Sequence, residues 1–506
     1  MPILSSIVNW LNIKRLHQID LFRRYPADVQ REELFSLLER ARDTWYGKKY
    51  GFDRIRTLEE YQKQVPIMVY EDLQPTIMRV MEGEQNLLWP SEIKWFAKSS
   101  GTTSEKSKFI PVSWEALEDC HFRGGKDTIA IYSQNHPDNK LLTGKGLTLG
   151  GSHQISSYSN KSYYGDLSAI LIENMPFWGH FIRTPSQEVA LLDEWEEKME
   201  IITQETIRDN VTSLAGVPSW NLVLIKHILE TTGKKSLLEV WPNLEVFVHG
   251  GVSFTPYREQ FSKLIPSENM NYLEVYNASE GFFAIQDDPS TDDMMLMLDY
   301  GIFYEFVPLE EVFSSNPTAL PIEAVKPGVN YAIVISTNGG LWRYMIGDTV
   351  IFTSTFPHKI KISGRTKHFM NAFGEEIIIE NAEKALEIAC KKSDAILNEY
   401  TAAPIFMGDN VKGSHEWLIE FEKEPSDMDF FTSTLDNALC SINSDYEAKR
   451  YKSITLEMPT VRKLPRGSFY MWLSEKGKLG GQNKVPRLSN DRTLVEEIIS
   501  MQGISG

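Results

Sequence analysis

Hydrophobic and polar residues follow a helical spacing in the first part of the chain. This spacing covers residues 14–50, where charged residues alternate with apolar ones, and Gly51 follows as a helix stop. Further helical segments extend over residues 57–80. Amphipathic helices of this kind bury one face against a core. We therefore interpret the region as scaffold.

From residue 92 the pattern changes to short apolar runs that end in loops of small polar residues. The run 93–99 enters a hydroxyl-rich loop, residues 109–113 form a second strand-like run, and Ser113 is placed to cap a helix over 114–134. Four later strand-into-loop segments lie at 145–152, 212–220, 244–251 and 272–281, with helical segments at 220–233 and 255–265. This alternation predicts an α/β fold with its ligand site at the carboxyl ends of the strands.

The second half of the chain contains a β-rich stretch and then a separate α+β unit. Residues 301–365 read mainly as strands. Beyond them we expect helices at 375–393 and 427–443, strands at 416–424 and 453–461, and a final helical pair. We predict a large N-terminal domain of mixed sheets over 1–365 and a small α+β C-terminal domain over 366–506, the latter of ordinary domain size.

Composition narrows the function classes. The 506 residues carry a formal net charge of −17, which disfavours a broad nucleic-acid interface. The three cysteines lack metal-ligand or disulfide spacing, and we expect buried free thiols. The N-terminus lacks the pattern of a secretory signal, and no apolar run is long enough to span a membrane. We expect a cytoplasmic monomer that contacts neither nucleic acid nor membrane.

The strongest local signal is a loop of hydroxyl residues with one glycine, followed by lysines. It comprises Ser99, Ser100, Gly101, Thr102 and Thr103, and then Lys106 and Lys108. Glycine permits close approach of the backbone to a phosphate, and successive NH groups and hydroxyls can hold oxyanions. The loop is not a Walker A motif. Alone, it could equally be a solvated Ser/Thr turn.

Two acidic residues follow predicted strands. Glu280, within residues 276–281, could hold Mg²⁺ together with phosphate oxygens, or lie in a solvated polar turn. Asp348, within residues 343–348, could accept the hydroxyls of a ribose, or belong to an ordinary Gly-Asp turn.

Two cations complete the candidates. Lys484 lies in the glycine-containing stretch 480–487 and could neutralise charge on a transferred phosphate, or be a surface lysine. Arg123, on the helix after the phosphate loop, could pair with a substrate carboxylate, or form a surface ion pair. The aromatic stretch 153–177 could line an acyl pocket or pack as core, and the sequence leaves this choice open.

Taken in order, these motifs resemble the adenylate-forming superfamily of acyl and aryl ligases. The closer resemblance is to the Gretchen Hagen family of acyl acid amido synthetases, which is known from auxin-responsive plants, and specifically to a bacterial-type member. The matching residues are Ser99–Thr103 with Lys108 and Phe109-Ile110-Pro111; Tyr276, Ser279, Glu280 and Gly281; Leu341, Arg343, Tyr344, Gly347 and Asp348; Gln482, Lys484, Pro486 and Arg487; and the strand end His249 to Ser253. Trp342, Met345 and Asn483 depart from the family pattern. The hinge after Arg365, with His368 in place of an Asp, looks closer to the wider superfamily.

The resemblance implies a reaction in two halves that consumes ATP with Mg²⁺. A carboxylic acid would become an acyl adenylate, and an amine, typically an amino acid, would take the acyl group. The implied catalytic residues are Lys484 and Glu280, with Glu280 also the Mg²⁺ ligand and Arg123 a candidate for the acyl substrate. The implied nucleotide-binding residues are Ser99, Ser100, Gly101, Thr102, Thr103, Lys108, Gly251, Val252, Tyr276, Asn277, Ser279, Asp348 and Arg365. The C-terminal domain would rotate between the two halves and so bring in and withdraw Lys484.

Two other functions stay open from the sequence. A thiol such as coenzyme A could replace the amine as acceptor. An inactive nucleotide-binding scaffold on the same fold is the second alternative. The presence of Glu280, Asp348 and Lys484 argues against it, because a protein without activity could lose these residues freely.

Overall fold

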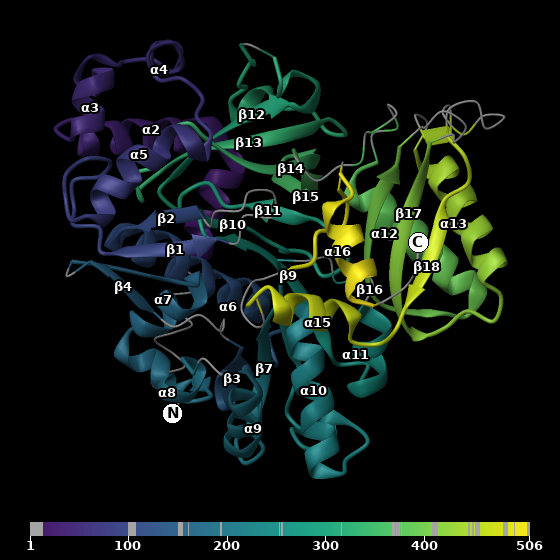
Figure 1. Ribbon diagram of the computed structural model, residues 1–506. Helices are drawn as coiled ribbons and strands as arrows, with labels where there is room; N and C mark the ends of the chain where they lie inside the picture. Colours follow the sequence, from purple (N-terminus) through teal and green to yellow (C-terminus); the bar gives the residue numbers. More distant parts are fainter. Residues whose placement is uncertain are drawn as a thin grey trace. The chain divides into compact units, whose positions relative to one another are not determined.

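A computed structural model provides the structure of the chain (Figure 1). It describes residues 14–502 with the following gaps: 100–107, 150–154, 160, 193–194, 252–253, 255–256, 315, 367–369, 371, 373–374, 376, 407–412, 444–445, 448–449, 451–455, 479–483 and 490. The described residues of 1–252 and 262–362 form one compact unit, and those of 253–261, 363–479 and 483–506 form a second.

The largest sheet has eleven strands among the described residues. Its order is β12-β13-β14-β15-β11-β10-β9-β8-β7-β3-β6. The strands are β3 (Lys145–Thr148), β6 (Arg183–Thr184), β7 (Val211–Gly216), β8 (Val246–His249), β9 (Asn271–Ala278), β10 (Gly281–Ile285), β11 (Met294–Leu296), β12 (Ile302–Pro308), β13 (Asn330–Thr337), β14 (Tyr344–Thr355) and β15 (His358–Arg365). The run from β6 to β9 is parallel, so its carboxyl ends lie along one edge.

A second sheet, of four strands in the described chain, has the order β2-β1-β5-β4. It contains β1 (Trp95–Ser99), β2 (Lys108–Val112), β4 (Ser156–Ser159) and β5 (Ser162–Gly165). The strands predicted over 93–99 and 109–113 are therefore confirmed. They pair antiparallel, with Ser99 opposite Lys108, so the hydroxyl-rich loop begins and ends at neighbouring backbone positions.

Ten α-helices, from α2 onward, are described within the first 365 residues. They are α2 (Pro26–Ala41), α3 (Trp45–Tyr50), α4 (Leu58–Gln64), α5 (Tyr70–Met81), α6 (Arg123–Asn135), α7 (Leu167–Glu173), α8 (Gln187–Ala190), α9 (Trp195–Thr206), α10 (Pro218–Thr232) and α11 (Arg258–Leu264). The larger part of α11 belongs to the second unit. Helix α2 packs on β12 and β13, whereas α9 and α10 lie side by side near β7 (Figure 1).

The helix predicted over residues 14–50 is divided into shorter helices. Pro26 occupies the first turn of α2, where its missing NH costs nothing, and Thr44 caps α3 by accepting from Gly47 N. Gly51 ends α3 in the left-handed region, with φ of 63°. The predicted helical region and its stop at Gly51 are confirmed, and local caps divide the region into separate helices.

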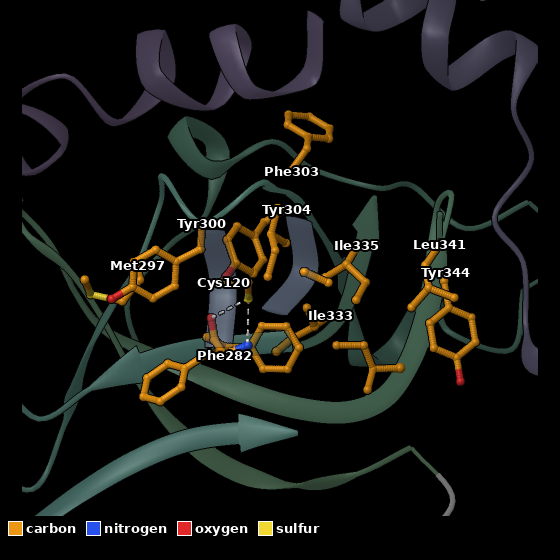
Figure 2. Packing of buried hydrophobic residues seen from close by; sticks show 14 of the residues in the cluster. Cys120, Phe282, Met297, Tyr300, Phe303, Tyr304, Ile333, Ile335, Leu341 and Tyr344 are labelled. Carbon is orange, nitrogen blue, oxygen red and sulfur yellow. Dashed lines mark hydrogen bonds between the residues drawn. The ribbon is translucent and has the colours of Figure 1, made fainter. Parts of the chain in front are cut away.

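Ser113 caps the next helix as expected, since its Oγ accepts from Ala116 N at 3.0 Å. The helix starts with a π-helical stretch, Ala116–Phe122, before α6. Cys120 of this stretch lies in the main core, where its Sγ accepts from Phe282 N at 3.1 Å (Figure 2). All three cysteines are free; Cys120 is buried, whereas Cys390 and Cys440 are partly exposed.

The second unit has a three-stranded sheet within its described residues. Its strands β16 (Ile396–Ile405), β17 (Ser414–Lys423) and β18 (Thr460–Leu464) adjoin α12 (Ile379–Ser393), α13 (Met428–Ile442), α15 (Ser468–Glu475) and α16 (Thr493–Met501). The sequence did not predict β16, because its Asn, Glu, Ala and Pro residues have low strand propensity. The strand expected at 453–461 is described only from Thr460 onward, and residues 451–455 lie outside the described chain.

The fold class is confirmed as α/β with mixed sheets and a smaller α+β part. None of the helices in the described residues is long and apolar enough to cross a bilayer.

Candidate active site

Lys108 is the first described residue after the hydroxyl-rich loop, and aromatic rings hold it. Its Nζ lies 3.4 Å from the Tyr344 hydroxyl and 5.6 Å from the centre of the Tyr70 ring. The Tyr70 hydroxyl in turn accepts from Phe109 N at 2.8 Å. These contacts bring the end of the loop to the start of β14. Ser100 to Thr103 lie outside the described residues, and only the backbone of Ser99 is described.

The second motif forms a tight hairpin between β9 and β10. Ala278 pairs with Gly281, so Ser279 and Glu280 make up the two-residue turn. Ser279 is buried and Glu280 is partly exposed. The carboxylate that the sequence assigns to Mg²⁺ is therefore carried by a turn that the sheet fixes.

The third motif contains a break in the β13–β14 ladder. The pairing shifts between Ala332 and Val334, and Gly347 has φ of 94°, which a side chain would disfavour. A bulge of this kind re-aims the residue beside it. Asp348 follows the bulge and is buried, with 6% of its surface exposed.

A hydrogen bond joins the second and third motifs directly. The Tyr276 hydroxyl donates to Asp348 Oδ2 at 2.6 Å. A short bond from a hydroxyl to a carboxylate is among the stronger protein hydrogen bonds. One oxygen of Asp348 is therefore oriented by Tyr276.

Tyr344 lies where the three motifs meet. Burial raises the pKa of Tyr344 well above its usual range, and the charges of Glu280 and Asp348 raise it further. Figure 2 shows the side chain at the margin of the hydrophobic cluster, with its hydroxyl directed away from the cluster. The hydroxyl stays protonated and adjoins Lys108. The sequence matched Tyr344 to a motif and assigned it no role; no spacing rule would have placed its hydroxyl here.

His121 is a second residue that the sequence analysis missed. Its Nδ1 lies 3.1 Å from Asn277 Oδ1, next to Tyr276 on β9. Burial lowers the pKa of His121 to about 4, and the hydrogen bond to Asn277 opposes this shift in part. The ring is neutral at physiological pH and orients the Asn277 amide. The sequence carried no signal for this role. In the structure, His121 lies in a π-helical stretch, and such bulges recur at functional sites.

The end of β8 shows why glycines follow His249. A Cβ at Gly250 would collide with the Val275 carbonyl of β9, and Gly251 has φ of 82°. Both positions require glycine. The backbone of Gly251 is exposed, and Val252 lies outside the described residues.

Arg343 of the third motif has a structural role. Its Nε and Nη2 donate to the two carboxylate oxygens of Glu305, at 2.8 and 2.9 Å, and its Nη1 donates to Val65 O at 2.7 Å. Both side chains are almost completely buried. The pair joins the start of β14 to β12 and to the end of α4.

Arg123 makes the ion pair that the sequence kept as the alternative to an acyl-site role. Its Nη2 lies 3.0 Å from Asp299 Oδ2, and its Nη1 donates to Asp299 O at 2.9 Å. Arg15 pairs with the same carboxylate. These contacts give Arg123 a partner within the protein, and they do not place it at an acyl substrate.

In the second unit, Lys484 precedes an anchored segment. Val485 is buried in a hydrophobic cluster, and Arg487 lies 4.8 Å above the Tyr400 ring and pairs with Glu399. The segment runs alongside Ala402 of β16. Lys484, which is partly exposed, is thus held at the start of a fixed strand-like stretch. The side chain of Arg365 lies outside the described residues.

The carboxylate of Glu280 suits Mg²⁺ that is bound mainly through the phosphates of a nucleotide. In the described chain, no group of three or more His, Cys, Asp or Glu side chains converges. Mg²⁺ commonly takes one or two carboxylates and completes its shell with phosphate oxygens and water. The single carboxylate of Glu280 on the β9–β10 turn fits that number of protein ligands.

Comparison with known proteins covers most of the chain. Residues 15–270 match the GH3 family N-terminal domain, 295–365 the GH3 family central domain, and 380–493 the GH3 family C-terminal domain. The indole-3-acetic acid-amido synthetase GH3.3 of Arabidopsis thaliana is 22% identical, over 96% of this chain and 93% of the relative. The jasmonoyl–L-amino acid synthetase GH3.5 of Oryza sativa subsp. japonica is 24% identical, over 96% of each. The solved GH3.15 acyl acid amido synthetase superposes with a TM-score of 0.78 at 18% identity, over 94% of this chain and 93% of the other, which shows a shared fold.

Proposed function

This chain belongs to the GH3 family, and from that premise we propose that it is an ATP-dependent acyl acid amido synthetase. One observation in the structure carries the proposal: the described parts of three separate motifs meet through the Lys108–Tyr344 and Tyr276–Asp348 contacts. A loop cation, a ribose-type carboxylate and the turn bearing Glu280 are thereby gathered at the carboxyl ends of the parallel strands, where α/β folds bind ligands.

In the first half of the reaction, an oxygen of the substrate carboxylate attacks the α-phosphorus of ATP. The bond to the bridging oxygen breaks, and pyrophosphate leaves with the electron pair. The loop Ser99–Thr103 and Lys108 hold the phosphates, and Lys484 neutralises charge on the transferred group. Glu280 would hold Mg²⁺, which supplies positive charge to the phosphate oxygens when bound.

The nucleoside is held by the later motifs. Asp348 accepts the ribose hydroxyls with one oxygen fixed by Tyr276. Gly251, Val252, Tyr276 and Asn277 border the adenine, and the nucleotide site also includes Ser279 and Arg365. Close approach of a planar base is favoured where Gly250 and Gly251 leave the backbone bare.

In the second half, the nitrogen of an amine attacks the acyl carbon, loses a proton, and displaces AMP. The protein forms no covalent bond to the acyl group, so its contribution is positioning and electrostatics. The relative GH3.5 is named for an L-amino acid product, and we propose an amino acid as the acceptor here. A C-terminal domain over 366–506 that rotates between the halves would let one site serve both. The proposal includes a monomer that acts in the cytoplasm.

The test is a matrix of carboxylic acids and amino acids, scored first by pyrophosphate release. Each acid that supports pyrophosphate release is then incubated with either an amine or coenzyme A, and AMP release is measured. Amine-dependent AMP release with a matching amide product supports the proposal. AMP release that needs the thiol would favour a thioester-forming ligase, and a matrix with no acid-dependent exchange would favour an inactive scaffold.

A further inference from the structure

Arg183 of β6 is a buried cation, and two of its nitrogens lack a hydrogen-bond partner among the described residues. It is 7% exposed, and within the described part of the chain its Nε and Nη2 have no hydrogen-bond partner. Burial lowers the pKa of Arg183 to about 10, against an opposing effect of Glu205, so the side chain stays charged at neutral pH. A buried charge is unfavourable unless an anion or acceptor compensates it.

Acidic side chains near β6 are already engaged elsewhere. The Glu205 carboxylate accepts from Ser186 N at 2.6 Å and from Ser186 Oγ at 3.1 Å. Asp209 accepts from Thr184 Oγ1 at 2.6 Å and pairs with Lys145 Nζ at 2.8 Å. Neither carboxylate forms an ion pair with Arg183.

The sheet register shows which face carries Arg183. Arg183 lies opposite Gly146 of β3, which lies opposite Ser213 of β7. Residues in register on neighbouring parallel strands point to the same face. Thr148 and Ala215, two residues further along, share that face. Small side chains therefore lie between Arg183 and the carboxyl ends of the strands.

Solvent reaches this face near the carboxyl ends of β3 and β7. Thr148, Ser213 and Ala215 are partly exposed although β3 and β7 are interior strands, whereas Leu147 and Leu214 on the opposite face are buried. Ser213 precedes the end of β7 by three residues, or about 10 Å of strand. A molecule that reacts at the strand ends can therefore extend along this face toward Arg183.

We propose that Arg183 binds a carboxylate of a substrate other than the reacting one. The proposal rests on the proposed function. The carboxylate belongs either to a dicarboxylic acid at its distal end or to the amino acid acceptor. A guanidinium can bind either one through two parallel hydrogen bonds. Arg183 is then a specificity-determining binding residue that leaves the chemistry of adenylation unchanged.

The experiment compares wild type with Arg183→Met, which keeps side-chain length and removes the charge. The matched control is Arg208→Met, at an exposed arginine beside the same segment. One arm measures KM in ATP–pyrophosphate exchange with straight-chain mono- and dicarboxylic acids of equal length. The other arm measures amine-dependent AMP release with alanine and with ethylamine, its counterpart without the carboxylate.

The expected result is selective. Arg183→Met raises KM about tenfold or more for the carboxylate-bearing member of one pair, and leaves its partner compound unchanged. The affected pair identifies the source of the carboxylate, and Arg208→Met changes neither pair. An equal change for both members of each pair, or no change for either, would overturn the proposal.

A binding measurement separates this proposal from the proposed function. The dicarboxylic acid or alanine should raise the melting temperature of wild type and not that of Arg183→Met. If the Met variant does not fold, Arg183→Lys replaces it, and a smaller thermal shift than in wild type is expected because Lys cannot form the two parallel hydrogen bonds. Acid-independent exchange in wild type would refute the proposed function alone. Equal thermal shifts in wild type and variant would refute the Arg183 site alone.

Discussion

At the scale of single residues, two tyrosine hydroxyls organise the candidate site. Tyr276 orients Asp348, and Tyr344 adjoins Lys108. The sequence identified Asp348, Glu280 and Lys108 because their motifs keep a recognisable order. It gave no role to Tyr344, since Tyr344 and Lys108 lie on strands of two different sheets and are far apart in the chain.

Replacing Tyr276 with Phe should weaken ATP binding without unfolding the protein. The change removes a bond to a buried carboxylate worth about 1–2 kcal/mol, so we expect KM for ATP to rise roughly fivefold to thirtyfold. Pyrophosphate exchange at varied ATP measures it, and Tyr272→Phe on the same strand is the control. A double variant with Asp348→Asn should be no worse than Asp348→Asn alone; additive losses would show that Tyr276 does not act through Asp348.

The neutral state of His121 should make stability depend on pH. Its folded pKa of about 4 lies below the unfolded value of about 6.5. The unfolded chain therefore binds the proton first, and the stabilisation present above pH 6.5 is lost as pH falls toward 4, by about 3 kcal/mol. Urea titrations across this window should show a shallower pH dependence for His121→Gln, and the wild-type dependence for the exposed His17→Gln. Equal slopes in all three proteins would contradict the assignment.

At the scale of elements, local caps and bulges determine where helices and strands begin, end or bend, which a periodic pattern alone does not show. Pro26 and Thr44 mark where the predicted N-terminal helical region is divided, and Thr44 is a capping residue that is visible in the sequence. Strand β16 was missed because its pairing with β17 outweighs weak local propensity. The bulge at Gly347 was likewise not predictable, although the glycine itself was part of the matched motif.

The buried pair of Arg343 and Glu305 should be important for stability. Arg343→Met leaves the Glu305 carboxylate buried beside a single amide of Gln62, and removal of one partner from a buried pair costs about 3–5 kcal/mol. Chemical denaturation measures the loss. Lys361→Met, which breaks an exposed pair with Asp292, should cost less than about 1 kcal/mol. Similar losses of unfolding free energy in the two variants would mean that burial does not make the Arg343 pair more important for stability than an exposed pair.

At the scale of the whole molecule, two compact units carry the motifs. Lys108, Glu280 and Asp348 belong to the first unit, and Lys484 belongs to the second. The order of the motifs was sufficient to predict the fold class and the family, because several weak matches in sequence order are jointly specific. The acyl pocket could not be predicted, since its residues follow from packing and carry no motif.

Lys484→Ala should separate binding from chemistry. We expect adenylation to fall at least about a hundredfold, because a preorganised cation on the transferred phosphate is lost, whereas the Kd for ATP changes less than about threefold. Amide formation from a chemically prepared acyl adenylate should continue. Exchange assays and calorimetry measure the two quantities, and Lys478→Ala in the same unit is the control. Equal adenylation in wild type and Lys484→Ala would remove the proposed role.

In the proposed reaction, the chain activates a carboxylic acid and transfers its acyl group to an amine. The most direct test is mass spectrometry of reactions that contain ATP, an acid that supports pyrophosphate exchange, and one amino acid. An amido synthetase forms one amide for each AMP released, and no amide when the acid, ATP or amino acid is omitted. AMP released without amide, or only when coenzyme A is present, would contradict it.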